Sequence, residues 1–191
     1  MNTHMLIANE LLNQANGNKI YLINRKRFIW GNIKPDCVSK YKLKKHYYNE
    51  SIYMILDKIY ELSNLSISDV IFDYGKNKFS EELGVVCHFL CDFFCVPHNQ
   101  EWHFKNALKK HVIYEKVLAA VAKKYKPIPY IYSNLKVEDI EKFIVYHQLK
   151  YQRKVSYTND LTFSYFVCNS IINCILNQVV INEYNREEKV S

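Results

Sequence analysis

Apolar residues recur along most of this chain at the three-to-four-residue spacing of amphipathic helices. The spacing predicts helices at residues 3–12, 51–62, 79–94, 101–124, 137–154 and 160–184, and a helix or extended connection at 19–30. Connections are expected at 16–18, 31–36, 64–78 and 126–129, where glycine, proline and asparagine gather. The last helix is apolar on more than one face, which is typical of a helix at the centre of a bundle.

The predicted helix from Phe79 to Phe94 has clear end signals. Ser80 is expected to cap its start, with glutamates in the first turn behind it. Pro97 is expected to end it, because proline disfavours the helical conformation in the residue before it. His98 would then project from a loop rather than from the helix face.

Composition narrows the fold class. A length of 191 residues fits one domain with a substantial core, and only four glycines and four prolines favour long helices with short connections. The 49% hydrophobic content argues against disorder. We therefore expect an all-α, single-domain multi-helix bundle covering residues 1–191.

Charge and cysteine content bear on partners and location. A net charge of +7 implies attraction to polyanions: a phospholipid surface, a phosphate-bearing substrate or nucleic acid. No apolar run of 18 residues and no signal-like start is present in the sequence, so neither a membrane span nor secretion is predicted, and a cytoplasmic location is expected. Cys87, Cys91 and Cys95 repeat every fourth residue, which favours packed, reduced thiols; a cysteine metal site is the alternative.

Candidate chemistry is concentrated in a stretch of 32 residues that contains His88, Asp92, His98, His111 and Glu115. His88 and Asp92 are four residues apart, and so are His111 and Glu115. On a helix, side chains at this spacing project from one face about 5 to 6 Å apart. A single His or Asp on an apolar helix is usually a hydrogen-bonded core residue. Burying five such groups near phenylalanines is costly without a compensating cation, so shared metal coordination is favoured.

Three more residues are individually ambiguous. His4 lies at the start of the first helix, where a solvated terminus is the simpler interpretation, although its imidazole could face inward to a metal. Asp36 follows Pro35 and could form an Asx turn or a cap. His46 follows a basic run. His147 has no acid or His four residues away and is assigned to packing or the surface.

The ordered set of these residues resembles the zinc-dependent phospholipase C family, in the superfamily shared with S1/P1-type nucleases. The resemblance rests on the opening Thr-His-Met-Leu-Ile-Ala-Asn, on Asp36 and His46, on His88-xxx-Asp92-xxxxx-His98 with Pro97, and on His111-xxx-Glu115. It covers roughly residues 3–120, and the helical remainder is compatible with it.

The resemblance implies two to three zinc ions per chain. One would be held by Asp36, His46, His88 and Asp92, and a second by His98, His111 and Glu115. A third would be held by Asp92 as a bridge together with His4. Imidazole nitrogens and carboxylate oxygens are the usual donors of catalytic zinc sites. The resemblance also implies that Asp36 acts as the base that orients the attacking water.

Two departures from the family are visible. Secreted members begin, after processing, with a tryptophan that chelates the third metal, whereas His4 here follows Met1, Asn2 and Thr3, so a weaker third site is expected. The lipid-binding C-terminal domain of some members is not seen, so membrane contact would come from this domain itself.

Together, the residues and the resemblance predict a zinc-dependent phosphodiester hydrolase that cleaves phospholipid head groups. Peripheral contact with an anionic membrane surface is compatible with the positive charge. A nuclease-like or other phosphoesterase on the same metals is the second choice, with nucleic acid as its partner. A helical zinc-binding protein without turnover is the alternative outside enzymes, although structural zinc prefers closed Cys/His sites.

Overall fold

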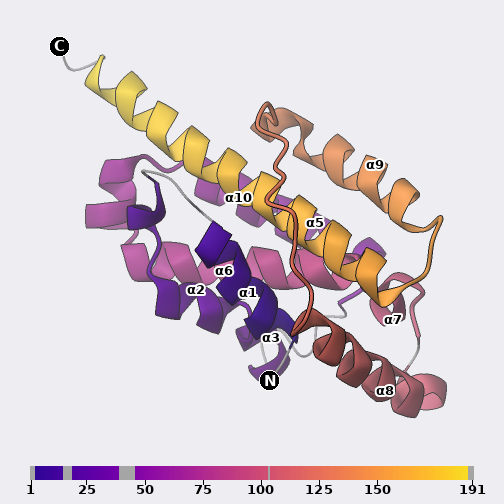
Figure 1. Cartoon of the computed structure of the whole chain (residues 1–191). Helices are drawn as coiled ribbons and strands as arrows, with labels where there is room; N and C mark the ends of the chain where they lie inside the picture. The colour runs from indigo at the N-terminus through magenta and orange to yellow at the C-terminus, as the bar shows by residue number, and fades with distance from the viewer. Residues whose placement is uncertain (1–2, 15–18, 39–45, 103, 189–191) are drawn as a thin grey trace.

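A computed structural model describes residues 3–14, 19–38, 46–102 and 104–188, without the side chains of residues 104–106. Every regular element in this part of the chain is helical, which confirms the all-α prediction (Figure 1). The elements are α1 Thr3–Gln14, η1 Ile20–Leu22, α2 Arg25–Gly31, α3 Lys34–Cys37, α5 Tyr48–Ser63, η2 Asp69–Asp73, α6 Lys76–Phe93, α7 Val96–Asn99, α8 Phe104–Ala122, η3 Val137–Asp139, α9 Ile140–Tyr151 and α10 Tyr157–Glu187. The assignment of residues 1–191 to one domain stays a prediction.

Helix α6 lies at the centre of the bundle and contacts α2, α5 and α10. Residues 83–93 of this helix are all buried, polar His88 and Asp92 included. The long helix α10 crosses the bundle and packs against α1, α5, α6, α8 and α9. By length and mean hydropathy α10 could cross a membrane, but 61% of its most apolar window is buried against other elements.

Two glycines allow α2 to approach α6 unusually closely. A Cβ atom on Gly31 would lie 2.0 Å from the Glu81 carbonyl oxygen, and one on Gly84 would lie 2.3 Å from the Phe28 carbonyl oxygen. Any larger side chain at either position would push the helices apart. This contact places the end of α2 directly beside the buried part of α6.

Several predicted boundaries were wrong. Helix α6 begins at Lys76, after Gly75 with its positive φ of 89°, and not at Ser80. The Ser80 hydroxyl instead donates to the Lys76 carbonyl oxygen and accepts from the Asn24 amide, so it serves the interior of the helix. The predicted end at Phe94 is correct to within one residue, because α6 ends at Phe93, and Pro97 lies at the start of the next helix.

Three predicted connections contain helical turns. Residues 64–78 include the π-helical η2, and residues 31–36 lead into α3 with Asp36 in its first turn. His98 belongs to the single turn α7 rather than to a loop. The expected end of the first helix at Asn16-Gly17-Asn18 lies outside the described residues. All six cysteines are free, and five of them are buried, as packed thiols would be.

Candidate metal centre

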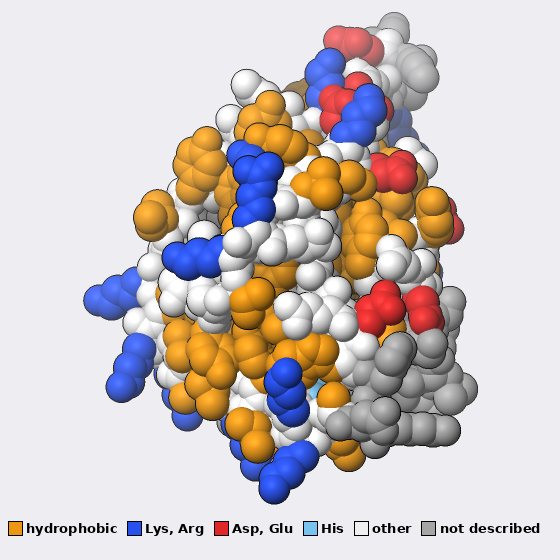
Figure 2. Space-filling model, turned by 90° about the vertical axis from the view of Figure 1, so that its right-hand side faces the viewer, with side chains coloured by type: hydrophobic (Ala, Val, Ile, Leu, Met, Phe, Trp, Pro, Cys, Tyr) orange, Lys and Arg blue, Asp and Glu red, His pale blue; other side chains and the backbone are white. Residues whose placement is uncertain are grey.

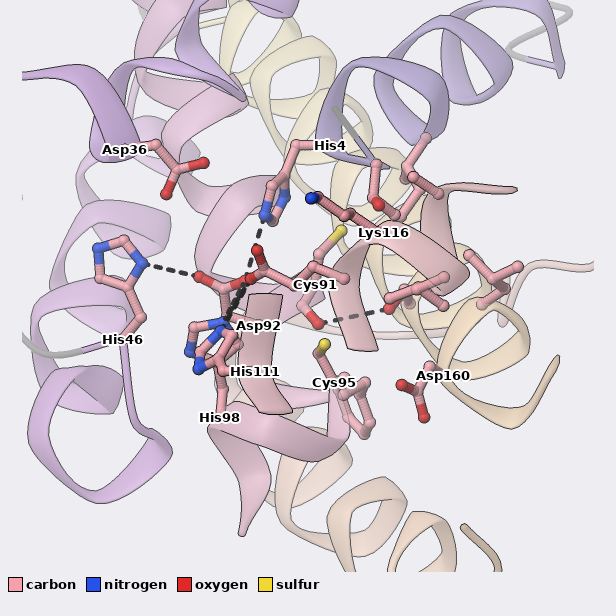
Figure 3. Close-up of a pocket in the computed structure, with 18 of the residues that line it drawn as sticks. His4, Asp36, His46, Cys91, Asp92, Cys95, His98, His111, Lys116 and Asp160 are labelled. Atoms are coloured by element: carbon pink, nitrogen blue, oxygen red, sulfur yellow. Dashed lines mark hydrogen bonds and ion pairs between the residues drawn. The ribbon is translucent and has the colours of Figure 1, made fainter. Parts of the chain in front are cut away.

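The eight candidate ligands come together from six segments of the chain, the first at His4 and the last at Glu115. Seven of the eight line one cavity of about 810 Å³ (Figure 3). The eighth, His88, is fully buried, and its Nε2 lies 3.1 Å from Asp92 Oδ2. The contributors are His4 from α1, Asp36 from α3, His46 just before α5, His88 and Asp92 from α6, His98 from α7, and His111 and Glu115 from α8. The predicted constellation is therefore a single cluster in space.

The carboxylate of Asp92 is the hub of this cluster. Its Oδ2 lies 2.9 Å from His46 Nδ1 and 3.1 Å from His88 Nε2. Its Oδ1 lies 3.3 Å from His4 Nε2 and 3.6 Å from His98 Nε2. The two oxygens thus face two different sets of imidazoles, which is the arrangement that a bridging carboxylate requires.

The orientation of His88 is fixed from the far side of its ring. Nδ1 lies 2.9 Å from the backbone carbonyl oxygen of Asn32, a buried residue at the end of α2. Because a carbonyl can only accept, Nδ1 carries the proton and Nε2 presents its lone pair to the cluster. The close contact of Gly31 with Gly84 is what brings Asn32 within reach.

The candidate ligands form three groups, and within each group the ligand atoms lie within 4.8 Å of one another. They are Asp36, His46 and His88; His98, His111 and Glu115; and His4, His88 and Asp92. The first group contains the residues of the first zinc site that the resemblance implies, without Asp92, and the second group has the same residues as the second site. In the third, His88 joins the pair of Asp92 and His4, so His88 belongs to two groups.

The group around α8 is more open. Glu115 Oε1 accepts from His111 Nε2 at 2.9 Å and lies 3.5 Å from His98 Nε2. The rings of His98 and His111 meet edge to face with centroids 4.8 Å apart. The Glu115 side chain is 48% exposed, whereas the Asp92 side chain is 3% exposed.

The electrostatics favour a cation in the cluster. Burial alone would raise the pKa of Asp92, but the imidazoles of His98, His88 and His4 hold it well below its usual range. Burial likewise opposes the ionisation of Glu115, yet hydrogen bonds from His111 and His98 lower its pKa to about 2. Both carboxylates are therefore anionic at neutral pH and demand positive charge close by.

The donor set fits zinc. Asp92 Oδ2 is buried and forms no hydrogen bond of good geometry with the described residues, although two imidazole nitrogens lie within 3.1 Å of it. The nitrogens of His46 and His88 are themselves 3.3 Å apart. Electronegative atoms that converge in this way on one point fit a shared cation, and nitrogen and carboxylate oxygen are the donors zinc prefers.

Further residues of the cavity wall were not predicted as site residues. Asp160 is buried beside Cys95 and accepts from the hydroxyls of Tyr114 and Tyr151, each at 2.8 Å. Its only signal in the sequence is an acid at the start of an apolar helix. Lys116 also lines the cavity, and its ammonium points toward His4 (Figure 3).

Comparison with known proteins gives one match. The sequence model of the family described as zinc dependent phospholipase C matches residues 3–163. No curated protein and no solved structure matches the chain. The matched segment includes all eight candidate ligands and most of the chain, so this protein belongs to the zinc-dependent phospholipase C family.

Proposed function

We propose that this protein is a zinc-dependent phosphodiester hydrolase that cleaves phospholipid head groups. The observation that carries the proposal is the Asp92 carboxylate, whose oxygens face His46 and His88 on one side and His4 on the other. Three ligand groups around one buried carboxylate suit a multinuclear catalytic centre better than a structural zinc site, which is usually a closed Cys/His tetrahedron.

The side chains divide naturally among the metals. Asp36, His46, His88 and Asp92 Oδ2 would hold one zinc, while His98, His111 and Glu115 would hold another. Asp92 Oδ1 and His4 would contribute to a third. When bound, such zinc ions activate water near neutral pH and stabilise charge on a phosphate.

Asp36 is the proposed base that orients the attacking water. Its side chain is 40% exposed and lines the cavity, so it is open to both water and substrate. Its Oδ1 lies 3.7 Å from His88 Nε2, close enough for Asp36 to share the same zinc. One carboxylate oxygen can therefore bind metal while the other accepts a hydrogen bond from water.

The cavity walls suit a phosphodiester with an apolar part. The candidate ligands form much of its polar lining, and its apolar lining includes Ile7, Phe94, Leu118 and Leu161. A phospholipid carries its phosphate next to apolar chains, so one substrate could contact both the polar and the apolar lining of the cavity. The family's zinc-dependent phospholipase C activity supports the same choice.

The test is zinc content together with turnover of three substrates by one purified sample: short-chain phosphatidylcholine, a nucleotide diester and single-stranded DNA. We expect at least two zinc ions per chain after dialysis, and hydrolysis of the phospholipid that chelator abolishes. His111→Ala should lower both zinc content and turnover. His147→Ala is the matched control, because this histidine packs against Phe143 and Phe166, away from the cluster.

Each contrary outcome has a definite meaning. Preferred hydrolysis of DNA would replace the phospholipid with nucleic acid as the substrate. Bound zinc without turnover of any diester would leave a non-catalytic zinc protein. Less than one zinc per chain, with a melting temperature that chelator does not change, would remove the basis of the proposal.

A further inference from the structure

Helix α8 presents apolar side chains on two sides of the helix. Its inner side carries His111 and Leu118 into the fold. Ile113 and Val117, one turn apart, are 52% and 37% exposed on the outer side, and Leu108 and Val112 are 44% and 40% exposed along the rim of the cavity. We call these four side chains the apolar strip; exposed apolar side chains that gather in this way on one helix suggest a contact surface.

The charge on the same helix is one-sided. Lys109, Lys110 and Lys116 are exposed on α8, and Lys110 also lies over the Trp102 ring, 3.9 Å from its centroid. The sequence of α8 contains a single acid, Glu115, which is engaged by His111 and His98. The outward surface of the helix is therefore basic and apolar, the composition of helices that lie in a membrane interface.

The apolar strip is continuous with the candidate metal centre. Leu108, Val112 and Lys116 line the cavity that holds the ligands, while Ile113 and Val117 continue the surface outward. Figure 2 looks onto the side of the molecule where α9 and the start of α8 lie in Figure 1. Hydrophobic side chains gather in its lower part, Lys and Arg stand among and around them, and acidic side chains lie toward its upper and right margins.

We propose that α8 is a docking helix that seats the mouth of the cavity on an anionic phospholipid bilayer. This inference rests on the proposed function, because a phospholipid substrate must be reached from a membrane surface. Ile113 and Val117 would enter the boundary between head groups and acyl chains. Lys109 and Lys110, each attracted to anionic lipid, would hold the helix in the plane of the interface.

The experiment measures binding of the zinc-loaded protein to sedimented vesicles of phosphatidylcholine, with and without about one-third phosphatidylserine. The test variant is Ile113→Asp/Val117→Asp, which changes neither a cavity residue nor a candidate ligand. The matched control is Ile181→Asp on α10, at a similarly exposed position (47%). Turnover of short-chain phosphatidylcholine, dissolved as monomers, and zinc content are measured for each protein.

The expected results are specific to α8. The wild type and Ile181→Asp should bind the anionic vesicles, more weakly at high salt, and the α8 variant should bind at least about tenfold less. Zinc content and turnover of the monomeric lipid should be equal in all three. The inference would be overturned if the α8 variant still bound the vesicles as wild type does. If this variant also changed its oligomeric state, the apolar strip would be assigned to contact with a second copy of the chain.

Failure of the proposed function would look different. A wild type that does not hydrolyse the monomeric lipid fails as a phospholipase whether or not it binds vesicles. If the wild type hydrolyses the monomeric lipid but does not bind anionic vesicles, the proposed function stands and the docking role of α8 is rejected.

Discussion

Helices α6 and α8 each supply a histidine and an acid four residues apart, yet they create very different halves of the centre. On α6, the side chains of His88 and Asp92 are 0% and 3% exposed. On α8, those of His111 and Glu115 are 8% and 48% exposed. The same local spacing thus produces one pair that is fixed inside the core and another whose acid meets solvent.

The difference comes from what surrounds each pair. Residues 83–93 of α6 are buried on every side, and the Asn32 carbonyl holds His88 from behind. In the part of the chain that the structure describes, α8 packs through its inner side, and the Glu115 side chain is 48% exposed to solvent. In the buried half, charges interact strongly and removal of one leaves the others uncompensated. We therefore expect the α6 half to hold its metal more tightly than the α8 half.

The largest expected effect is that of Asp92→Asn. The change removes the charge that all surrounding imidazoles share, while it keeps the side-chain volume. Turnover should fall by about 1,000-fold or more, because metal activation contributes several kcal/mol and each 1.4 kcal/mol is tenfold in rate. Kinetics and elemental analysis measure the loss, with exposed Asp57→Asn on α5 as the charge control. Full zinc content with more than about a tenth of the activity would contradict the hub role of Asp92.

Glu115→Gln should have a smaller effect. Glu115 belongs to only one of the candidate ligand groups found among the described residues, and its side chain is half exposed, so water can replace it. We expect the loss of about one zinc per chain on dialysis and a drop in turnover of about 10- to 100-fold, partly restored by added zinc. If this variant and Asp92→Asn lose equal activity at equal metal content, the two halves of the centre do not differ as described.

Gly84→Ala tests how the bundle supports the α6 half. A Cβ atom there would meet the Phe28 carbonyl oxygen at 2.3 Å, so α2 must move and carry the Asn32 carbonyl away from His88. Zinc affinity should fall about tenfold and stability by about 1–3 kcal/mol. The buried neighbour Val85→Ala is the control: it should lower stability without changing zinc affinity. Equal zinc affinity in both variants would mean that the hydrogen bond from His88 to Asn32 is dispensable.

The smallest effect concerns Asp160, which lies beside the α8 half. Burial raises its pKa to about 6 despite hydrogen bonds from Tyr151 and Tyr114. A raised acid pKa means that the folded state takes up the proton first, so this group costs stability above about pH 6 and the cost fades as pH falls. In chelator-treated protein, the melting temperature of Asp160→Asn minus that of wild type should increase by a few degrees as pH rises from about 5 to 7. A difference that does not change with pH would show that Asp160 keeps an ordinary pKa.

The sequence predicted those parts of the site that depend on local geometry. His88 with Asp92 and His111 with Glu115 are each one helical turn apart, and each pair meets at about 3 Å, as the spacing required. The all-helical fold followed from the scarcity of glycine and proline. Asp36, His46 and His4 were joined to the cluster only by resemblance, because their approach depends on how separate helices pack.

Other features could not be predicted because they depend on tertiary contacts. Ser80 has the composition of a cap, but its hydroxyl is used between α2 and α6, and Gly75 provides the break instead. The role of Gly84 is visible only once Gly31 lies against it. Asp160 becomes part of the cavity wall because Tyr114 and Tyr151, from two other helices, meet it there.

The most direct test of the central claim is anomalous diffraction at the zinc edge from crystals of the dialysed protein. We predict one zinc at about 2.0–2.2 Å from Asp92 Oδ2, shared with Asp36, His46 and His88, and a second zinc among His98, His111 and Glu115 with lower occupancy. A map with no zinc peak in contact with the Asp92 carboxylate would contradict the account.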